Sequence, residues 1–199
     1  MEGARTFTRR RVIAGSAATA GAAAVSVATG VELLSGQGAS SLSDAEPLAL
    51  ALALERLQAA FYAEALAGGT LSGELLSFAT TAAEHEAEHE GLLVPLVPDP
   101  PDEPAYDFGP DTSDPAAFAA AAASLEDLTV SAYNGLLPGL TERGLAIAAR
   151  IVSVDARHAA WIRAINGDDP AARPVDQSLD ADRVVQRLEA TGYLTQATP

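Results

Sequence analysis

The chain has 199 residues, 48% of them hydrophobic, and contains no cysteine. This length is enough for one domain with a proper core, and the lack of cysteine excludes disulfides, thiolate catalysis and cysteine-based zinc sites. All twelve basic residues are arginine, and 27 acids leave a formal net charge of -15, which argues against nucleic acid or an anionic membrane surface as a partner.

The first forty residues have the pattern of a leader. Arg9, Arg10 and Arg11 form a twin-arginine motif, and residues 12–31 are uncharged and mostly Ala, Gly, Ser and Thr. This pattern is typical of a Tat export signal. A transmembrane anchor is the alternative by length, but the segment is only weakly apolar. We expect residues 1–40 to direct export, leaving no stable membrane domain after removal, or to retain the protein if left uncleaved.

A first helix is predicted over residues 47–67, with Asp44 as its N-cap and a Gly-Gly pair as its stop. The stripe that defines it, at steps of three and four, consists of Leu48, Leu52, Glu55, Ala59, Tyr62 and Leu66. Glu55 is therefore an acid within an otherwise apolar face, a placement that is rare for an acid without a partner.

A second helix is predicted over residues 72–97, with Pro98 as breaker and Pro95 fraying its last turn. One of its faces consists of Ala79, Ala82, Ala83, Glu86, His89 and Leu93. On this helix Glu84 and Glu88 point away from Glu86, so we expect them to be solvated.

A third helix is predicted over residues 115–137, with Asp114 as its cap and proline at its first position. The fourth is predicted over residues 141–165 and ends at Asn166-Gly167. Both are long enough to span a small bundle, since 20 residues of helix are about 30 Å long.

The connections indicate the topology. The links within each helix pair are short, but residues 98–115 form an eighteen-residue segment with six prolines and no periodicity. Fully extended, it reaches up to about 60 Å, so it can cross the length of the bundle. A Pro/Asp-rich linker then leads to a short helix over residues 181–190, whose apolar side is Val184, Val185 and Leu188. We expect this last helix to cap the bundle.

The two helix pairs repeat each other. The interval in sequence from Glu55 to Glu126 equals the interval from Tyr62 to Tyr133, and each glutamate follows a leucine. Two duplicated antiparallel hairpins are therefore expected. The tyrosines lie two turns beyond the glutamates, where their hydroxyls either bond to a metal ligand or only accompany ordinary aromatic packing.

An acid three positions before a histidine occurs once in each pair. These motifs are Glu86 with His89 and Asp155 with His158. Side chains three apart on a helix point into the same cavity and can hold one metal together. Helices that supply Glu, Glu-x-x-His, Glu and an acid-x-x-His give the side-chain set of a carboxylate-bridged di-metal site.

The sequence therefore predicts a di-metal centre. Its ligands would be Glu55, Glu86, His89, Glu126, Asp155 and His158. Four carboxylates balance two divalent cations, and mixed carboxylate and imidazole ligands favour iron or manganese. The outer candidates, which would bond to the ligands, are Tyr62, Tyr133 and His85. The sequence does not identify a catalytic residue.

These motifs resemble the ferritin-like superfamily, specifically the exported ferritin-like proteins related to desiccation-associated proteins. The segments that carry the resemblance are Ala51-Leu52-Ala53-Leu54-Glu55, Ala60-Phe61-Tyr62, Glu86-Ala87-Glu88-His89, Leu125-Glu126, Ala132-Tyr133 and Asp155-Ala156-Arg157-His158-Ala159-Ala160-Trp161. The resemblance covers about residues 45–195 and implies a four-helix bundle with a di-iron or di-manganese centre. Asp155 departs from the family pattern, which has Glu there.

The resulting expectation is an all-α protein, a ferritin-like four-helix bundle of two antiparallel hairpins joined by a long crossover, plus a short C-terminal helix. The expected parts are a signal over residues 1–40, the bundle over 41–167, and a linker with the capping helix over 168–199. The partners would be metal ions and a small oxidant such as dioxygen or peroxide, in a ferroxidase or peroxide-detoxifying role. A homo-oligomer is compatible with the sequence.

Two other functions remain open from the sequence. The first is a non-catalytic stress or desiccation-associated protein whose metal site is weak or structural. The second, more remote, is a zinc protease, because residues 85–89 read His-Glu-x-x-His, in which His85 and His89 would bind zinc and Glu86 would be the general base. Against it, the chain has no strand-forming segments, and the repeat pairs Glu86 and His89, rather than His85, with the second hairpin.

Overall fold

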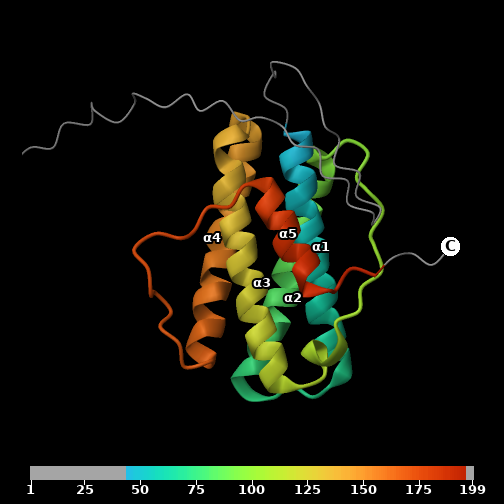
Figure 1. The fold of residues 1–199 in the computed structure, drawn as a ribbon, viewed down its shortest axis with the longest axis vertical. Coiled ribbons are helices and arrows are strands. Elements are labelled where there is room, and N and C mark those ends of the chain that lie inside the picture. Colours follow the sequence, from blue (N-terminus) through green and yellow to red (C-terminus); the bar gives the residue numbers. More distant parts are fainter. Residues whose placement is uncertain (1–43, 196–199) are drawn as a thin grey trace, which may run out of the picture.

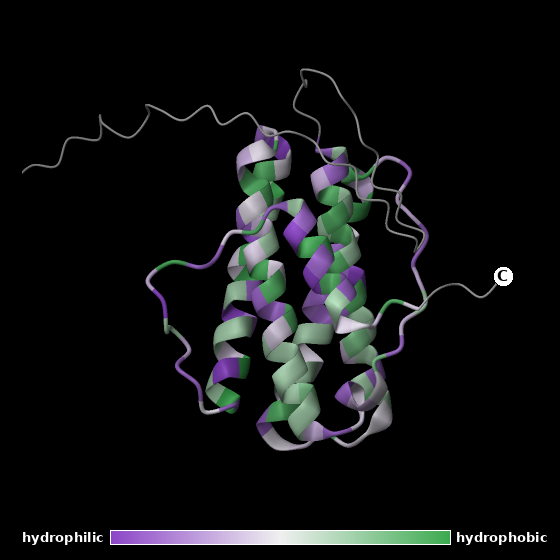
Figure 2. Ribbon diagram, in the orientation of Figure 1, coloured by the Kyte–Doolittle hydropathy of each residue, from purple (hydrophilic) through white to green (hydrophobic). Residues whose placement is uncertain are grey.

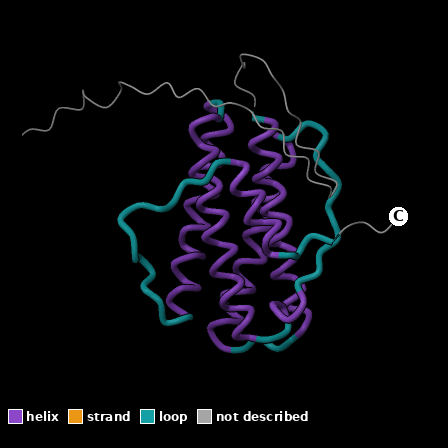
Figure 3. The backbone as a smooth tube through the Cα atoms, viewed as in Figure 1, coloured by secondary structure: helices purple, strands orange, loops and turns teal. Residues whose placement is uncertain are grey.

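Four long helices lie side by side in the computed structural model, which describes residues 44–195 (Figure 1). The helices are α1 (Ala45–Gly68), α2 (Gly73–Leu93), α3 (Pro115–Leu136), α4 (Glu142–Ile165) and the short α5 (Ala181–Thr191). No strand is present in this part of the chain (Figure 3), apart from an isolated bridge between Tyr106 and Leu194. The all-α fold class is confirmed, whereas the signal predicted for residues 1–40 lies outside the described residues.

Both helices of the first hairpin end for a local reason. Gly69 follows α1 in the left-handed conformation at φ 66°, and its N–H bonds to the carbonyl of Leu66, a geometry that glycine adopts without strain. The second helix ends at Leu93, earlier than predicted, and Val94–Leu96 continues as a 3-10 turn. The cause is Pro95, which has no N–H to donate to the preceding turn.

The crossover between the hairpins runs the length of the bundle, as predicted (Figure 1). It contains one 3-10 turn, Gly109–Thr112, and is tied to α1 where Nη1 of Arg56 donates to the carbonyl of Pro101 at 2.6 Å. Because it returns the chain to the end where α2 began, α3 starts parallel to α2, and the α3–α4 hairpin packs beside the α1–α2 hairpin.

Asp44 stands at the N-cap position of α1, but its side chain does not cap that helix. Its carboxylate instead accepts hydrogen bonds from the backbone N–H of Thr141, at 2.7 Å, and from the Thr141 hydroxyl. Asp44 therefore adds negative charge at the N-terminus of α4, where the helix dipole favours it. Gly144 makes this approach feasible, because a Cβ there would lie 2.6 Å from an Asp44 carboxylate oxygen.

The C-terminal segment packs on the second hairpin. The backbone N–H of Leu179 donates to the carbonyl of Ser131 at 2.9 Å, and α5 lies against α3. Its three buried residues are Val184, Val185 and Leu188, as the apolar side predicted. Gly135 on α3 is required here, because a Cβ at this position would lie 1.7 Å from the carbonyl oxygen of Leu179.

Aromatic rings fill part of the core of the bundle. The rings of Phe61 and Phe118 stack with centroids 5.2 Å apart, and both contact Tyr62 edge to face. Hydrophobic residues recur along each helix in Figure 2, and the buried ones form a core cluster to which all five helices contribute. In residues 44–195, none of the helices combines the length and apolarity that crossing a bilayer requires.

Candidate metal centre

Six titratable side chains meet inside the four-helix bundle, and we call them the carboxylate–histidine cluster. They are Glu55, Glu86, His89, Glu126, Asp155 and His158. The four carboxylates have no exposed surface, and the two histidines are 5% exposed or less. The structure thus brings together every residue that the sequence singled out as a ligand, one or two from each of α1 to α4.

The helical period explains this convergence. Glu86 and His89 lie three positions apart on α2, and Asp155 and His158 lie three apart on α4, so each pair projects into the same space. Single glutamates on α1 and α3 face these pairs across the bundle. The apolar residues around them exclude water, as Ala82 does on α2 and Ile151 on α4, both fully or almost fully buried.

The cluster divides into two overlapping groups. Glu86 and Asp155 belong to both, joined in one group by Glu55 and His89 and in the other by Glu126 and His158. Within each group the four candidate ligand atoms lie within 4.8 Å of one another. We call the group with Glu55 and His89 position 1. The group with Glu126 and His158 is position 2.

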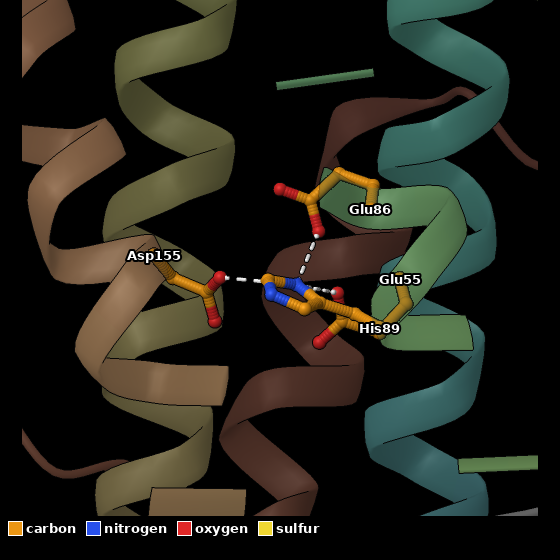
Figure 4. Close-up of side chains that lie close together, drawn as sticks. All are labelled: Glu55, Glu86, His89 and Asp155. Atoms are coloured by element: carbon orange, nitrogen blue, oxygen red, sulfur yellow. Dashed lines mark hydrogen bonds and ion pairs between the residues drawn. The ribbon is translucent and has the colours of Figure 1, made fainter. Parts of the chain in front are cut away.

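Position 1 is arranged around the imidazole of His89 (Figure 4). Its Nδ1 lies 3.1 Å from Glu86 Oε2, 3.2 Å from Glu55 Oε2 and 3.4 Å from Asp155 Oδ1. Three carboxylates from three helices therefore surround one nitrogen. Asp155 is the farthest of the three, in keeping with its shorter side chain.

Position 2 repeats the arrangement around His158. Its Nδ1 lies 3.1 Å from Glu86 Oε1 and 3.7 Å from Glu126 Oε2. Glu86 thus turns one carboxylate oxygen toward each histidine, so this one residue could offer a ligand atom to each position.

Several buried atoms of the cluster lack a hydrogen-bond partner, and their chemistry indicates whether the cluster could hold metal ions. These atoms are Glu86 Oε1, Glu126 Oε2, both carboxylate oxygens of Asp155, and Nδ1 of His158. All can act as lone-pair donors, and Glu86 Oε1 and His158 Nδ1 are close without hydrogen-bond geometry. Because unsatisfied buried polar groups are costly, cations between these lone pairs would account for them.

The charges inside the bundle perturb the acids. Burial, followed by repulsion from Glu55, raises the pKa of Glu86 and of Asp155 well above the ordinary values of 4.5 and 3.8. Burial also works to raise the pKa of Glu55, but hydrogen bonds from His89 and Glu86 outweigh it, so this pKa is lowered. Burial works to lower the pKa of His89, and its hydrogen bond and attraction to Glu55 raise it instead. Without metal, the cluster therefore retains protons.

Each tyrosine bonds to the glutamate of the opposite hairpin. The hydroxyl of Tyr62 on α1 donates to Glu126 on α3 at 2.5 Å, and that of Tyr133 on α3 donates to Glu55 on α1 at 2.6 Å. Burial, followed by the charge of the glutamate it touches, raises the pKa of each tyrosine well above 10.0. Both hydroxyls thus stay protonated, and each orients one carboxylate oxygen of the glutamate to which it donates.

A buried polar pair that joins α1 to α3 was not predicted. Thr129 Oγ1 donates to Gln58 Oε1 at 2.5 Å, and both residues are 1% exposed. The repeat could have revealed them, because Gln58 and Thr129 are separated by the same interval as Glu55 and Glu126 and interrupt apolar stripes at the same place. They lie one turn beyond the glutamates.

His85 lies at the outer side of position 2. Its Nδ1 is 2.9 Å from Nε2 of His158, and the two rings stack with centroids 5.1 Å apart. Burial and the neighbouring His158 lower its pKa. Neither group of candidate ligands includes His85, so the single-zinc arrangement of a zinc protease, with His85 and His89 on one ion, is not what these residues form.

Residues outside the cluster have other roles. Glu84 and Glu88 are exposed on the far side of α2, as predicted. Trp161 is partly buried against Phe78, with ring centroids 5.5 Å apart, and its indole N–H donates to Glu74 at 3.1 Å. Trp161 therefore joins α4 to α2 at the edge of the core.

Comparison with known proteins agrees with this geometry. No curated protein matches the chain. The family described as the ferritin-like domain matches residues 43–168, well over half of the chain. The matched residues include α1 to α4 and the whole carboxylate–histidine cluster. The chain belongs to the ferritin-like domain family.

Proposed function

We propose that this protein is an exported di-metal carboxylate protein that binds two iron or manganese ions and reacts with dioxygen or peroxide. One observation carries the proposal: the two groups of candidate ligands overlap at Glu86 and Asp155. A single ion needs only one such group, whereas two groups with shared carboxylates suit a pair of ions held close together.

Each residue of the cluster would have a defined part. Glu86 and Asp155 would help to hold the ions at both positions, with Glu55 and His89 completing position 1. Glu126 and His158 would complete position 2. Two divalent ions would neutralise four carboxylate charges. This would offset the burial and the repulsion that together raise the pKa values of Glu86 and Asp155.

The bound pair would supply two electrons which, with two protons, reduce dioxygen to hydrogen peroxide or peroxide to water. The protein's own residues would hold the geometry. Tyr62 and Tyr133 orient the glutamates Glu126 and Glu55 from opposite hairpins. The buried apolar surroundings keep bulk water away from the carboxylates. The attraction between their charges and the ions would therefore be screened less than in water.

Metal analysis and iron oxidation test this proposal. Metal-free protein is loaded anaerobically with two equivalents of Fe(II), and bound iron is measured after desalting. Exposure to oxygen or peroxide is then followed by the near-ultraviolet absorption of oxidised iron. We expect two ions per chain and oxidation faster than in buffer. The Glu84→Gln variant is the control, because Glu84 is exposed and lies outside the cluster.

The test separates the competing functions. Protein that binds no iron or manganese at micromolar concentrations would be a non-catalytic bundle, the stress-associated alternative. One zinc per chain, with proteolysis that is lost in Glu86→Gln, would favour the zinc protease.

Export is the remaining part of the proposal, and it is supported by the twin-arginine motif at Arg9 and Arg10. Fractionation of the source cells, with mass analysis of the mature N-terminus, tests it. Recovery of the full-length chain in the cytoplasm alone would contradict it.

A further inference from the structure

The two metal positions differ in what lies behind their histidines. His158 directs Nδ1 toward Glu86 Oε1 at 3.1 Å, and its other ring nitrogen, Nε2, lies 2.9 Å from Nδ1 of His85. His89 also directs Nδ1 toward the carboxylates. Among residues 44–195, however, no side chain makes a hydrogen bond to Nε2 of His89.

The repeat shows where this asymmetry comes from. The interval from Glu86 to Asp155 equals the interval from His89 to His158. The same step takes His85 to Val154, which has no polar atom in its side chain. The acid-x-x-His motifs of the two hairpins therefore differ only in having Glu in one and Asp in the other. A histidine directly precedes the acid only in the first hairpin.

A hydrogen bond at Nε2 controls how the opposite nitrogen can act. Neutral imidazole carries one proton, so Nδ1 can donate its lone pair to a metal only when the proton is on Nε2. In His158 that proton can be donated to Nδ1 of His85. The contact therefore favours the metal-binding tautomer of His158, and the stacked rings restrict its rotation.

We propose that His85 is a positioning residue that makes the two metal positions unequal, with position 2 preorganised to bind a divalent ion more tightly than it would without His85. Partners that orient metal-bound histidines contribute about 10- to 100-fold in metal affinity. In position 1, no side chain of residues 44–195 gives His89 such a contribution. This inference rests on the proposed function, since it assumes that both positions bind metal.

Cobalt(II) titration of the metal-free full-length protein tests the proposal. Binding constants are measured by calorimetry, and ligand geometry by the visible spectrum of cobalt. We expect the wild type to have two constants. In His85→Val, which installs the residue of the matching position in the other hairpin, one constant should weaken by about 10- to 100-fold while the other is unchanged.

Two further variants separate positioning from a general structural effect. His85→Gln keeps an acceptor for the Nε2 proton of His158 and should recover most of the lost affinity. Val154→Ala changes the matching position on α4, where no such bond exists, and should leave both constants unchanged. Circular dichroism of each metal-free variant establishes that the bundle is folded.

The outcomes are distinct. Equal weakening of both constants in His85→Val, no weakening at all, or a His85→Gln variant as weak as His85→Val would overturn the role of His85. In each of these cases the wild type would still bind two ions, and the proposed function would stand. A wild-type protein that binds no cobalt, iron or manganese would overturn the proposed function and this inference with it.

Discussion

The hydroxyl of Tyr62 on α1 donates a hydrogen bond of 2.5 Å to Glu126 on α3. The bond joins the first hairpin to the second, and its counterpart runs the other way, from Tyr133 to Glu55 at 2.6 Å. Each tyrosine thus fixes a carboxylate that its own hairpin does not supply. The arrangement links the packing of the hairpins to the geometry of the candidate metal centre.

Removing one of these hydroxyls should destabilise the metal-free protein. In Tyr62→Phe, the buried Glu126 loses a hydrogen-bond donor, and we expect the free energy of unfolding to fall by about 1–3 kcal/mol. Urea denaturation measures the change. Tyr106→Phe is the control, because no hydrogen bond of the Tyr106 hydroxyl is found among residues 44–195, and its effect should stay within about 0.5 kcal/mol. Equal losses in both variants would contradict this role.

Loss of either histidine should remove metal without unfolding the protein. His89→Ala takes a ligand from position 1, and His158→Ala takes one from position 2, so each should lower the metal content. The rise in melting temperature on metal loading should shrink accordingly, because binding to the native state is its source. Both metal-free variants should remain helical by circular dichroism. Metal content unchanged in both would argue strongly against the ligand assignment.

Asp155→Glu restores the residue type of the family pattern. In the wild type, Asp155 Oδ1 lies 3.4 Å from His89 Nδ1, farther than the 3.1 Å of Glu86 Oε2, and a longer side chain reaches closer. We expect metal loading equal to or better than that of the wild type, measured as ions bound per chain at limiting iron. The added methylene should cost about 1–3 kcal/mol in the metal-free protein. Lower occupancy would show that the aspartate is matched to this site.

The metal-free protein should become less stable as pH rises from about 5 to 8. The pKa values of Glu86 and Asp155 are raised in the folded state above the ordinary 4.5 and 3.8, so in this range the folded state binds more protons than the unfolded state. The free energy of unfolding therefore falls with pH. His89, whose pKa is also raised, acts in the same direction. Two lowered pKa values act oppositely: that of His85 below its ordinary 6.5 and that of Glu55 below 4.5. Within the range only His85 opposes, and it is a single, partly exposed group, so stability should still decline.

Urea denaturation at several pH values measures this slope, and the double variant Glu86→Gln, Asp155→Asn should flatten it. Saturating metal should also remove the decline, because cations replace the retained protons. A metal-free protein whose stability rises from pH 5 to 8 would contradict the raised pKa values.

Gly135→Ala should detach the C-terminal segment from α3. The added Cβ would lie 1.7 Å from the carbonyl oxygen of Leu179, so the segment before α5 must move. We expect the free energy of unfolding, measured by urea denaturation, to fall by about 3 kcal/mol. This is the upper end of the cost of overpacking, because backbone rather than a flexible side chain must move. Gly91→Ala on α2 is the control: its Cβ meets nothing within 4 Å, and alanine should stabilise the helix by about 0.5–1 kcal/mol. A loss in Gly91→Ala as large as in Gly135→Ala would mean that the close approach is not the cause.

The sequence predicted much of the fold because its signals are local. The helix stripes, the cap at Asp114 and the glycine stop after α1 depend on neighbouring residues, and Asp114 does accept from the N–H groups of Ala116 and Ala117. A prediction from local sequence was wrong where a residue bonds to a group that is distant in the chain. Asp44 has the residue type and position of an N-cap, but its carboxylate bonds to Thr141 at the start of another helix.

The same division holds for the candidate metal centre. Sequence alone determined the six residues of the cluster and their repeat, because motif spacing on a helix sets which side chains share a direction. Only the tertiary structure decided that each tyrosine serves the opposite hairpin, that Gln58 pairs with Thr129, and that His85 lies behind His158 rather than His89. These contacts depend on how the two hairpins pack against each other. A sequence repeat shows which positions correspond in the two hairpins, but not which side chains of one hairpin contact those of the other.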